Sequence, residues 1–300
     1  MKNRHFLTVA GTPVEDILEI FDVTARQKAT LRAGRRLKPV LQGKTLAMLF
    51  EKPSLRTRVS FEVAMTQLGG HVTTFGQGEV GFGKRETVAD IARVLCRYVD
   101  IISARVFKHS HLDEMAANST VPVVNMLSEY AHPCQALADL WTIKERLGRW
   151  EGVTVAFVGD GNNVARSLAL MCGMLGCHFS LCAPKGYEFS KSFLETLSRT
   201  PKHKGARFAQ GSDPRKLVRG ADVVYTDVWT SMGQESEQKA RQKAFAAYQV
   251  NRKLLKLAAP EAIVMHCLPA HRGEEITDEV MDGPQAAVYD QAENRLHTER

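Results

Sequence analysis

Short apolar runs alternate with stretches of helical periodicity along most of the chain. An apolar run of about four to eight residues is typical of a strand buried on both faces of a sheet. Such runs lie in the first half at 44–50, 71–75, 100–106 and 121–126, and in the second half at 153–158, 178–182, 207–209, 222–226, 262–266 and 287–289. Strands that alternate with helices are the pattern of parallel sheets covered by helices on both faces. We therefore predict an α/β protein.

A long helix predicted from Pro133 to about Leu147 separates the two series of strands, and Gly148 ends it. A chain of 300 residues is too long for one small core and suits two domains. We expect a first domain at 1–148, a second domain at 149–284, and a C-terminal segment, 285–300, that packs back towards the first domain.

The composition is that of an ordinary globular protein, with 44% hydrophobic and 24% charged residues. No apolar stretch approaches the length that a bilayer-spanning helix needs, so we expect a cytoplasmic protein without membrane contact. None of the six cysteines forms a C-x-x-C pair, which favours reduced thiols.

The formal net charge of +7 raises the question of nucleic acid binding. The basic residues are dispersed, however; the densest stretch, 26–38, has a helical pattern, and no nucleic-acid motif accompanies it. A modest cationic excess suits anionic small molecules, so we expect small-molecule substrates and no nucleic acid.

Ser54-Leu55-Arg56-Thr57-Arg58 follows the apolar run at 44–50 and precedes a predicted helix at 59–68. The backbone N–H groups at a helix start carry partial positive charge, and arginines and hydroxyls add strong donors for a phosphate. The segment therefore predicts a phosphate cradle. The alternative is a solvated helix start whose arginines hold no ligand.

Two further polar groups follow strands of the first half. Arg105 ends one predicted strand, and His132 and Gln135 open the long helix after the next. Active sites of open α/β sheets lie at the carboxyl ends of strands, so these side chains could reach the cradle and polarise a carbonyl. By itself, His132 is better explained as a helix cap or a buried structural histidine.

In the second half, Gly159-Asp160-Gly161-Asn162-Asn163 follows a strand but does not match G-x-G-x-x-G. The mismatch disfavours a dehydrogenase or a nucleotide-binding module, which is the competing class. The Asn163 amide could hold the carboxylate or amino group of an amino acid, and a plain polar turn explains it equally well.

Two more strand ends carry chemistry. Asp227 and Ser231 follow one strand, and could hold an ammonium group and a carboxylate together. His266-Cys267-Leu268-Pro269 closes another, and Leu-Pro favours an extended turn that exposes the Leu268 carbonyl. A Cys267 nucleophile with His271 as base, or metal binding by His266, Cys267 and His271, are less favoured interpretations.

Together these segments resemble the aspartate/ornithine carbamoyltransferase superfamily. Ser-x-Arg-Thr-Arg at 54–58 and His-Pro-x-Gln at 132–135 are typical of the whole superfamily, whereas Asp-Val-Trp-x-Ser-Met-Gly at 227–233 and His-Cys-Leu-Pro at 266–269 resemble its ornithine branch. The resemblance implies two Rossmann-like three-layer sandwiches linked by helices. It also implies carbamoyl transfer from carbamoyl phosphate to the δ-amine of L-ornithine, giving L-citrulline and phosphate, in arginine metabolism.

The resemblance further implies direct attack without a metal, cofactor or covalent intermediate, in a homotrimer or a multiple of trimers. Another amine acceptor, such as an acylated ornithine or putrescine, is the alternative. The implied catalytic residues are Arg105, His132, Asp227 and Cys267. Carbamoyl phosphate would be bound by Ser54, Leu55, Arg56, Thr57, Arg58, Arg105, His132, Gln135, Cys267, Leu268 and Arg295. Ornithine would be bound by Asn163, Asp227, Ser231 and Met232.

Overall fold

A computed structural model describes residues 5–82, 85–231 and 233–300. The chain divides into two compact units, one made of the residues up to Leu137 together with Arg295–Arg300, the other of Ala138–Asn294. Both divisions fall inside helices, namely α5 (Pro133–Leu147) and α12 (Val288–Glu299). The predicted domain limits at 148 and 284 do not coincide with these two division points; both lie inside the second unit, and they stay predictions.

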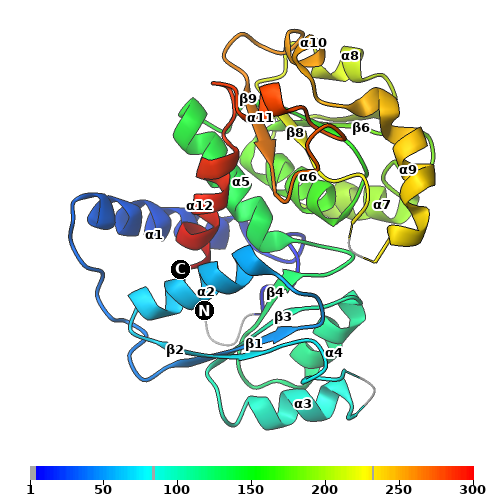
Figure 1. Cartoon of the computed structure of the whole chain (residues 1–300). Coiled ribbons are helices and arrows are strands. Elements are labelled where there is room, and N and C mark those ends of the chain that lie inside the picture. Colours follow the sequence, from blue (N-terminus) through cyan, green and yellow to red (C-terminus); the bar gives the residue numbers. More distant parts are fainter. Residues whose placement is uncertain (1–4, 83–84, 232) are drawn as a thin grey trace. The chain divides into compact units, whose positions relative to one another are not determined.

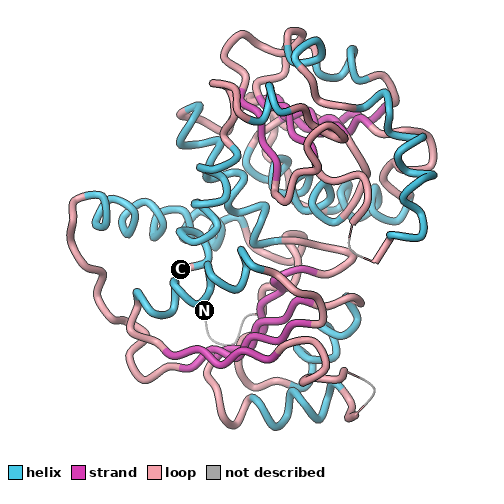
Figure 2. The backbone as a smooth tube through the Cα atoms, in the orientation of Figure 1, coloured by secondary structure: helices cyan, strands magenta, loops and turns pink. Residues whose placement is uncertain are grey.

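Among the residues described for the first unit, four parallel strands form one sheet in the order β2-β1-β3-β4 (Figures 1 and 2). The strands are β1 (Thr45–Phe50), β2 (His71–Phe75), β3 (Ile101–Arg105) and β4 (Val123–Leu127). The helices are α1 (Val14–Arg32), α2 (Leu55–Gln67), α3 (Val88–Leu95) and α4 (His109–Asn118).

Strand β1 shows how the layers are held together. Leu46 and Met48 belong to a buried cluster with Phe61 of α2. The intervening residues point the other way, and Leu49 joins a cluster with Leu112 of α4. Since side chains alternate across a strand, one strand contributes to the core on both faces of the sheet. The unit is therefore a three-layer sandwich.

In the described part of the second unit, five parallel strands form a sheet in the order β7-β6-β5-β8-β9. The strands are β5 (Thr154–Val158), β6 (His178–Cys182), β7 (Phe208–Gly211), β8 (Val223–Thr226) and β9 (Ile263–His266). The helices are α6 (Asn163–Leu175), α7 (Lys191–Arg199), α8 (Pro214–Val218), α9 (Gln238–Phe245), α10 (Arg252–Leu255) and α11 (Asp278–Met281), with 3-10 turns at Glu235–Glu237 and Ala246–Tyr248. The predicted α/β class with two parallel sheets is confirmed.

Two local predictions are wrong. The run at 287–289 is not a strand: Ala286 and Ala287 pair briefly with Val264, and helix α12 then begins at Val288. The helix predicted from Val59 begins earlier, at Leu55, so most of the cradle segment forms its first turn. Val288 and Tyr289 favour a strand at 287–289, and tertiary context overrides that preference. The earlier start of α2 agrees with the high helix propensity of Leu and Arg at 55–58.

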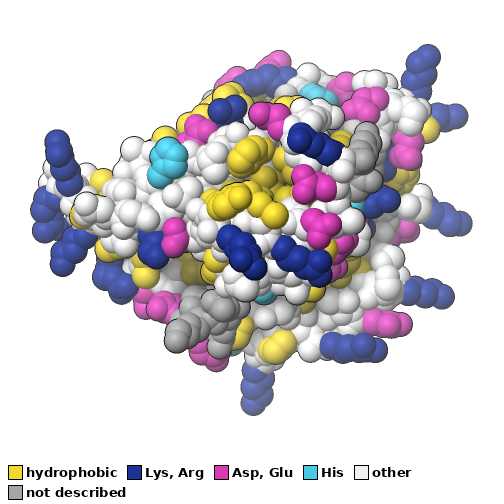
Figure 3. All heavy atoms as spheres, turned by 90° about the horizontal axis from the view of Figure 1, so that it is seen from below, with side chains coloured by type: hydrophobic (Ala, Val, Ile, Leu, Met, Phe, Trp, Pro, Cys, Tyr) yellow, Lys and Arg dark blue, Asp and Glu magenta, His cyan; other side chains and the backbone are white. Residues whose placement is uncertain are grey.

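The surface of the described residues agrees with the charge analysis. On the face drawn in Figure 3, Lys and Arg side chains occur in several places, with acidic groups between them. Helix α1 ends at Arg32, so the basic stretch at 26–38 is helical only in its first part. All six cysteines are free thiols. No described helix has the length and apolar character required to cross a membrane.

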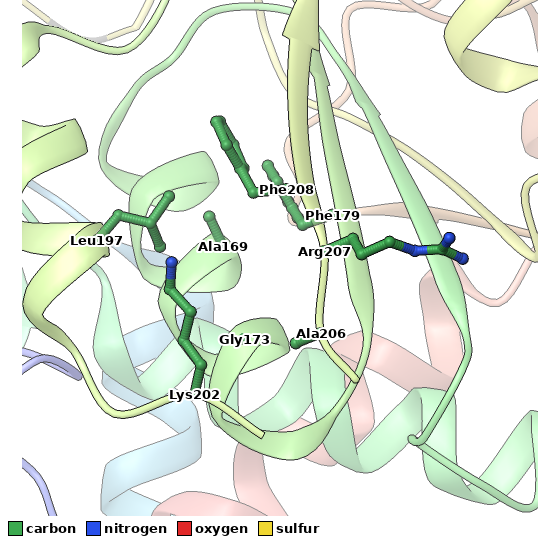
Figure 4. Close-up of a pocket in the computed structure, with 8 residues that line it drawn as sticks. All are labelled: Ala169, Gly173, Phe179, Leu197, Lys202, Ala206, Arg207 and Phe208. Atoms are coloured by element: carbon green, nitrogen blue, oxygen red, sulfur yellow. The ribbon is translucent and has the colours of Figure 1, made fainter. Parts of the chain in front are cut away.

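A small pocket in the second unit lies away from the predicted site residues (Figure 4). Apolar side chains such as Phe179 and Phe208 form its wall, while the Lys202 amine reaches towards Leu197 and the Arg207 guanidinium points away. Because it holds no converging polar groups, this pocket has the character of a packing gap rather than a binding site.

Candidate active site

Several of the predicted site residues follow the two neighbouring strands at which the strand order of each sheet reverses. In the first unit, β1 and β3 are neighbours, with β2 added on one side and β4 on the other; in the second unit, β5 and β8 take the same places. Ligands of open α/β sheets bind at the carboxyl ends of such strand pairs. The cradle follows β1, Arg105 ends β3, the Gly159 turn follows β5 and Asp227 follows β8.

The cradle residues do not all face the same way. Thr57 is 1% exposed, whereas Leu55 is 75% exposed. Arg58 is also exposed, and its Nε donates to Glu62 one helical turn later at 2.9 Å. Ser54 is the N-cap residue of α2 and makes no side-chain capping bond. Among the residues of the cradle, Thr57 is therefore the one whose side chain is buried.

Arg295 of helix α12 contacts Thr57, the buried residue of the cradle. Its Nη2 donates to Thr57 Oγ1 at 3.2 Å, and its Nη1 donates to Gln135 Oε1 at 2.9 Å. Arg295 is 6% exposed and Gln135 is 1% exposed. Three residues distant in sequence thus meet in one buried network inside the first unit.

His132 lies beside this network, directly before Pro133, which takes the first position of α5. Burial and the positive charges of Arg295 and Arg105 hold the pKa of His132 well below its ordinary value. The imidazole is therefore neutral at physiological pH and keeps one N–H donor. A neutral donor beside two guanidinium groups suits an oxygen that gains negative charge.

In the second unit, Asp227 is held by donors from two other segments. Asn162 Nδ2 donates to its Oδ2 at 2.8 Å, and Cys267 Sγ donates to its Oδ1 at 3.0 Å. Asp227 is 7% exposed. A nearly buried carboxylate with fixed oxygens is a good partner for an ammonium group.

The sequence pointed to Asn163, but its neighbour Asn162 makes the contact to Asp227. Asn162 is the N-cap of α6: its Oδ1 accepts from the N–H groups of Val164 and Ala165 at 3.0 and 3.1 Å, which leaves its amide nitrogen for Asp227. Asn163 Oδ1 accepts from Val164 N–H at 3.0 Å. The N-cap position before an apolar helix is the signal that could have identified Asn162 from the sequence.

Leu268 is held in an unusual backbone conformation, with φ of 59°, and precedes a cis peptide bond to Pro269. Its N–H donates to Nδ1 of His266 at 2.9 Å, so the Nε2 of that ring carries the proton that faces Glu275 Oε1 at 3.0 Å. Both His266 and Glu275 side chains are 0% exposed. Sequence analysis missed Glu275 because nothing local marks it as the partner of His266.

Ser231 is partly buried, and Met232 lies outside the described residues. The loop that carries Ser231 is braced by Arg241 of α9, which sequence analysis also missed. Arg241 Nη1 donates to Asp160 Oδ2 at 2.7 Å and to the Trp229 carbonyl at 3.1 Å, and its Nε donates to Glu237 at 2.8 Å. One side chain therefore links the loops that follow β5 and β8.

Potential metal ligands form two separate groups among the described residues. Asp227, His266 and Cys267 make one, and His271, Glu274 and Glu275 make the other. Cys267 and His271 therefore fall in different groups, unlike the less favoured interpretations from sequence. Both ring nitrogens of His266 are engaged with Leu268 and Glu275, so that ring could bind a metal only by breaking one of these bonds.

Comparisons with known proteins agree along the whole chain. The model of the aspartate/ornithine carbamoyltransferase carbamoyl-P binding domain matches residues 4–145. The model of the Asp/Orn binding domain of the same family matches residues 151–300. The chain belongs to the aspartate/ornithine carbamoyltransferase family.

Individual relatives of this family are similar over nearly their full length. The ornithine carbamoyltransferase of Hyperthermus butylicus is 51% identical over 298 residues, which are 99% of this chain and 95% of the relative. The solved ornithine carbamoyltransferase of Pyrococcus furiosus is 48% identical with a TM-score of 0.95, covering 99% of this chain and 95% of its own. An N-acetyl-L-ornithine transcarbamylase structure is 29% identical with a TM-score of 0.88, covering 98% and 97%.

Proposed function

We propose that this chain is an ornithine carbamoyltransferase of arginine metabolism, which converts carbamoyl phosphate and L-ornithine to L-citrulline and phosphate. The observation that carries the proposal is the full-length similarity, at about half of all positions, to proteins of that name. The matches to both a carbamoyl-P binding and an Asp/Orn binding domain support small-molecule substrates of these two kinds.

The first unit binds carbamoyl phosphate in this proposal. Arg56, Thr57 and Arg295 hold the phosphate, since guanidinium groups and a hydroxyl at a helix start are strong anion donors. Arg105, His132 and Gln135 contact the carbonyl end. The neutral His132 donates a hydrogen bond to the carbonyl oxygen as negative charge develops there, and the guanidinium group of Arg105 stabilises the same charge.

The second unit binds ornithine. Asp227 takes the α-ammonium group, because Asn162 and Cys267 fix its two oxygens. The unprotonated δ-amine attacks the carbonyl carbon and forms the C–N bond. The C–O bond to phosphate then breaks, phosphate leaves with the electron pair, and the amine loses its extra proton to solvent or a neighbouring base. The proposal also includes the remaining substrate contacts that the resemblance implies. These are made by Ser54, Leu55, Arg58, Asn163, Ser231, Met232, Cys267 and Leu268.

A citrulline assay with a panel of amines tests this proposal. Both substrates are supplied at saturation and alkaline pH, with L-ornithine, N-acetyl-L-ornithine and putrescine compared as acceptors. We expect kcat/KM for ornithine to exceed the others by at least about 100-fold, because acetylation neutralises the α-ammonium that pairs with Asp227 and putrescine lacks the α-carboxylate. Absence of citrulline would refute the proposal. A higher kcat/KM for another amine would show that this amine, and not ornithine, is the acceptor.

A homotrimer in the cytoplasm completes the proposal. Leu55 and Val59 lie one turn apart on α2 and expose 75% and 49% of their surface, which is costly for large apolar side chains unless another surface covers them. Light scattering should give a mass of roughly three times 33.3 kDa, or a multiple of that value. A mass equal to that of one chain at every protein concentration would contradict the trimer.

A further inference from the structure

Glu299 in the last turn of α12 carries no assigned role, yet it pairs with Arg295. Its Oε1 accepts from Arg295 Nε at 2.7 Å and is also bridged by Nη2. The Glu299 side chain is 1% exposed, and the two residues are one helical turn apart. A carboxylate so deeply buried is costly unless its partners are fixed.

Glu299 contacts the edge of the guanidinium group that is formed by Nε and Nη2. Arg295 donates through Nε and Nη2 to Glu299, while Nη1 reaches Gln135 and Nη2 also reaches Thr57. A planar guanidinium held along one edge by a carboxylate has its other donors aimed in fixed directions. Here those directions lead to two residues assigned to carbamoyl phosphate.

Glu299 is itself anchored on the helix that carries the cradle. Its second carboxyl oxygen, Oε2, accepts from Ser60 Oγ, and Ser60 lies one turn after Thr57 on α2 and also contacts the Thr57 carbonyl at 3.2 Å. Ser60 is 8% exposed. Residues Thr57, Ser60, Glu299 and Arg295 therefore form a buried ring of polar contacts between two helices of the first unit, in which Glu299 and the Thr57 carbonyl share the single hydroxyl proton of Ser60.

We propose that Glu299, anchored by Ser60, is a positioning residue that orients the Arg295 guanidinium for the phosphate group of carbamoyl phosphate. The inference rests on the proposed function for the identity of the substrate, and on the ring of contacts for the role of the residue. Burial raises the pKa of Glu299, whereas Arg295 and Ser60 act in the opposite direction. The acceptor geometry of Glu299, rather than its charge alone, is what the role requires.

Kinetics of a matched pair of variants test the role. Glu299→Met keeps the length of the side chain and removes the acceptor; Glu299→Gln keeps an acceptor oxygen. We expect Glu299→Met to raise the KM for carbamoyl phosphate about tenfold and the KM for ornithine less than about twofold, and Glu299→Gln to stay within about threefold of the parent. Ser60→Ala, which leaves the pair intact, should raise the same KM by a smaller factor. Glu195→Gln on α7, exposed in the other unit, is the control.

Calorimetric titration with inorganic phosphate separates this inference from the proposed function, because it needs no turnover. Glu299→Met should weaken phosphate binding in the parent chain but change it by less than about twofold in an Arg295→Met background. If the parent forms no citrulline, the proposed function fails and this cycle still decides the role of Glu299.

Four outcomes would overturn the inference. The parent chain could fail to bind phosphate, or Glu299→Met could bind it more tightly, which would make Glu299 a competitor. Equal changes in both KM values, or a lower melting temperature with unchanged KM values, would make Glu299 an anchor of α12 only.

Discussion

The two units hold their key charged groups in opposite ways. In the first, a cationic side chain, Arg295, is fixed by acceptors on three other residues: Gln135, Thr57 and Glu299. In the second, an anionic side chain, Asp227, is fixed by donors. Pre-oriented charges of opposite sign suit ligand groups of opposite sign, a phosphate and an ammonium. The proposed division of the two substrates between the units therefore follows from the opposite charges of Arg295 and Asp227.

The largest effect in this comparison is expected from Arg56→Ala in the first turn of α2. Removing a guanidinium that binds the leaving phosphate should lower kcat/KM by roughly 10³-fold, because its stabilisation grows as the phosphate leaves. Citrulline formation measures the loss. Arg93→Ala, an exposed arginine of α3 in the same unit, should keep the activity of the parent. Full activity of Arg56→Ala would show that the cradle does not bind the phosphate group.

Asp227→Asn should act on the other substrate. The amide has no charge for the α-ammonium, and its nitrogen would face the donors of Asn162 or Cys267. We expect kcat/KM for ornithine to fall roughly 100-fold while the KM for carbamoyl phosphate changes less than about twofold. Initial-rate kinetics with each substrate varied in turn will show this, with Asp278→Asn as an exposed control. Equal losses for both substrates would contradict the division between the units.

Arg241→Met should destabilise the second unit and loosen its loops. Asp160 would lose its partner in a largely buried place, and we expect the free energy of unfolding to fall by about 3 kcal/mol. Urea denaturation measures this change. Since Arg241 also holds the Trp229 carbonyl, the KM for ornithine should rise more than the KM for carbamoyl phosphate. A stability loss with an unchanged ornithine KM would limit Arg241 to a structural role.

His132 should make the first unit sensitive to acid. Its folded pKa lies well below 6.5, so below that pH the unfolded chain binds a proton that the folded chain does not. Stability is therefore present above pH 6.5 and is lost as pH falls. Between pH 7 and 5 the parent should therefore lose more stability than His132→Gln. Denaturation curves at the two pH values test the difference; parallel losses would place the His132 pKa near its ordinary value.

Sequence patterns were most informative where the physics is local. Apolar runs located the strands of both sheets, and Gly148 marked the end of α5, where it has φ of 74°. The error at 287–289 arose because Val288 and Tyr289 favour strands, while the pairing of Ala286 with Val264 is followed by a helix that only the tertiary fold determines.

The site was only partly accessible from the sequence. Motifs identified Thr57, Gln135, Arg295 and Asp227, but the residues that hold them are set by contacts between distant segments. Glu299 meets Ser60 across 239 positions, and no local pattern predicts such a pair. Asn162 was within reach, since it is the N-cap of a helix, but the amide chemistry alone led to its neighbour Asn163.

The division of the two substrates between the units is tested most directly by titrating freshly dissolved carbamoyl phosphate into three proteins in a calorimeter. The parent and Asp227→Asn should bind it with dissociation constants that agree within about twofold, and Arg56→Ala should show at least roughly 100-fold weaker binding. Loss of binding in Asp227→Asn together with retained binding in Arg56→Ala would contradict the account.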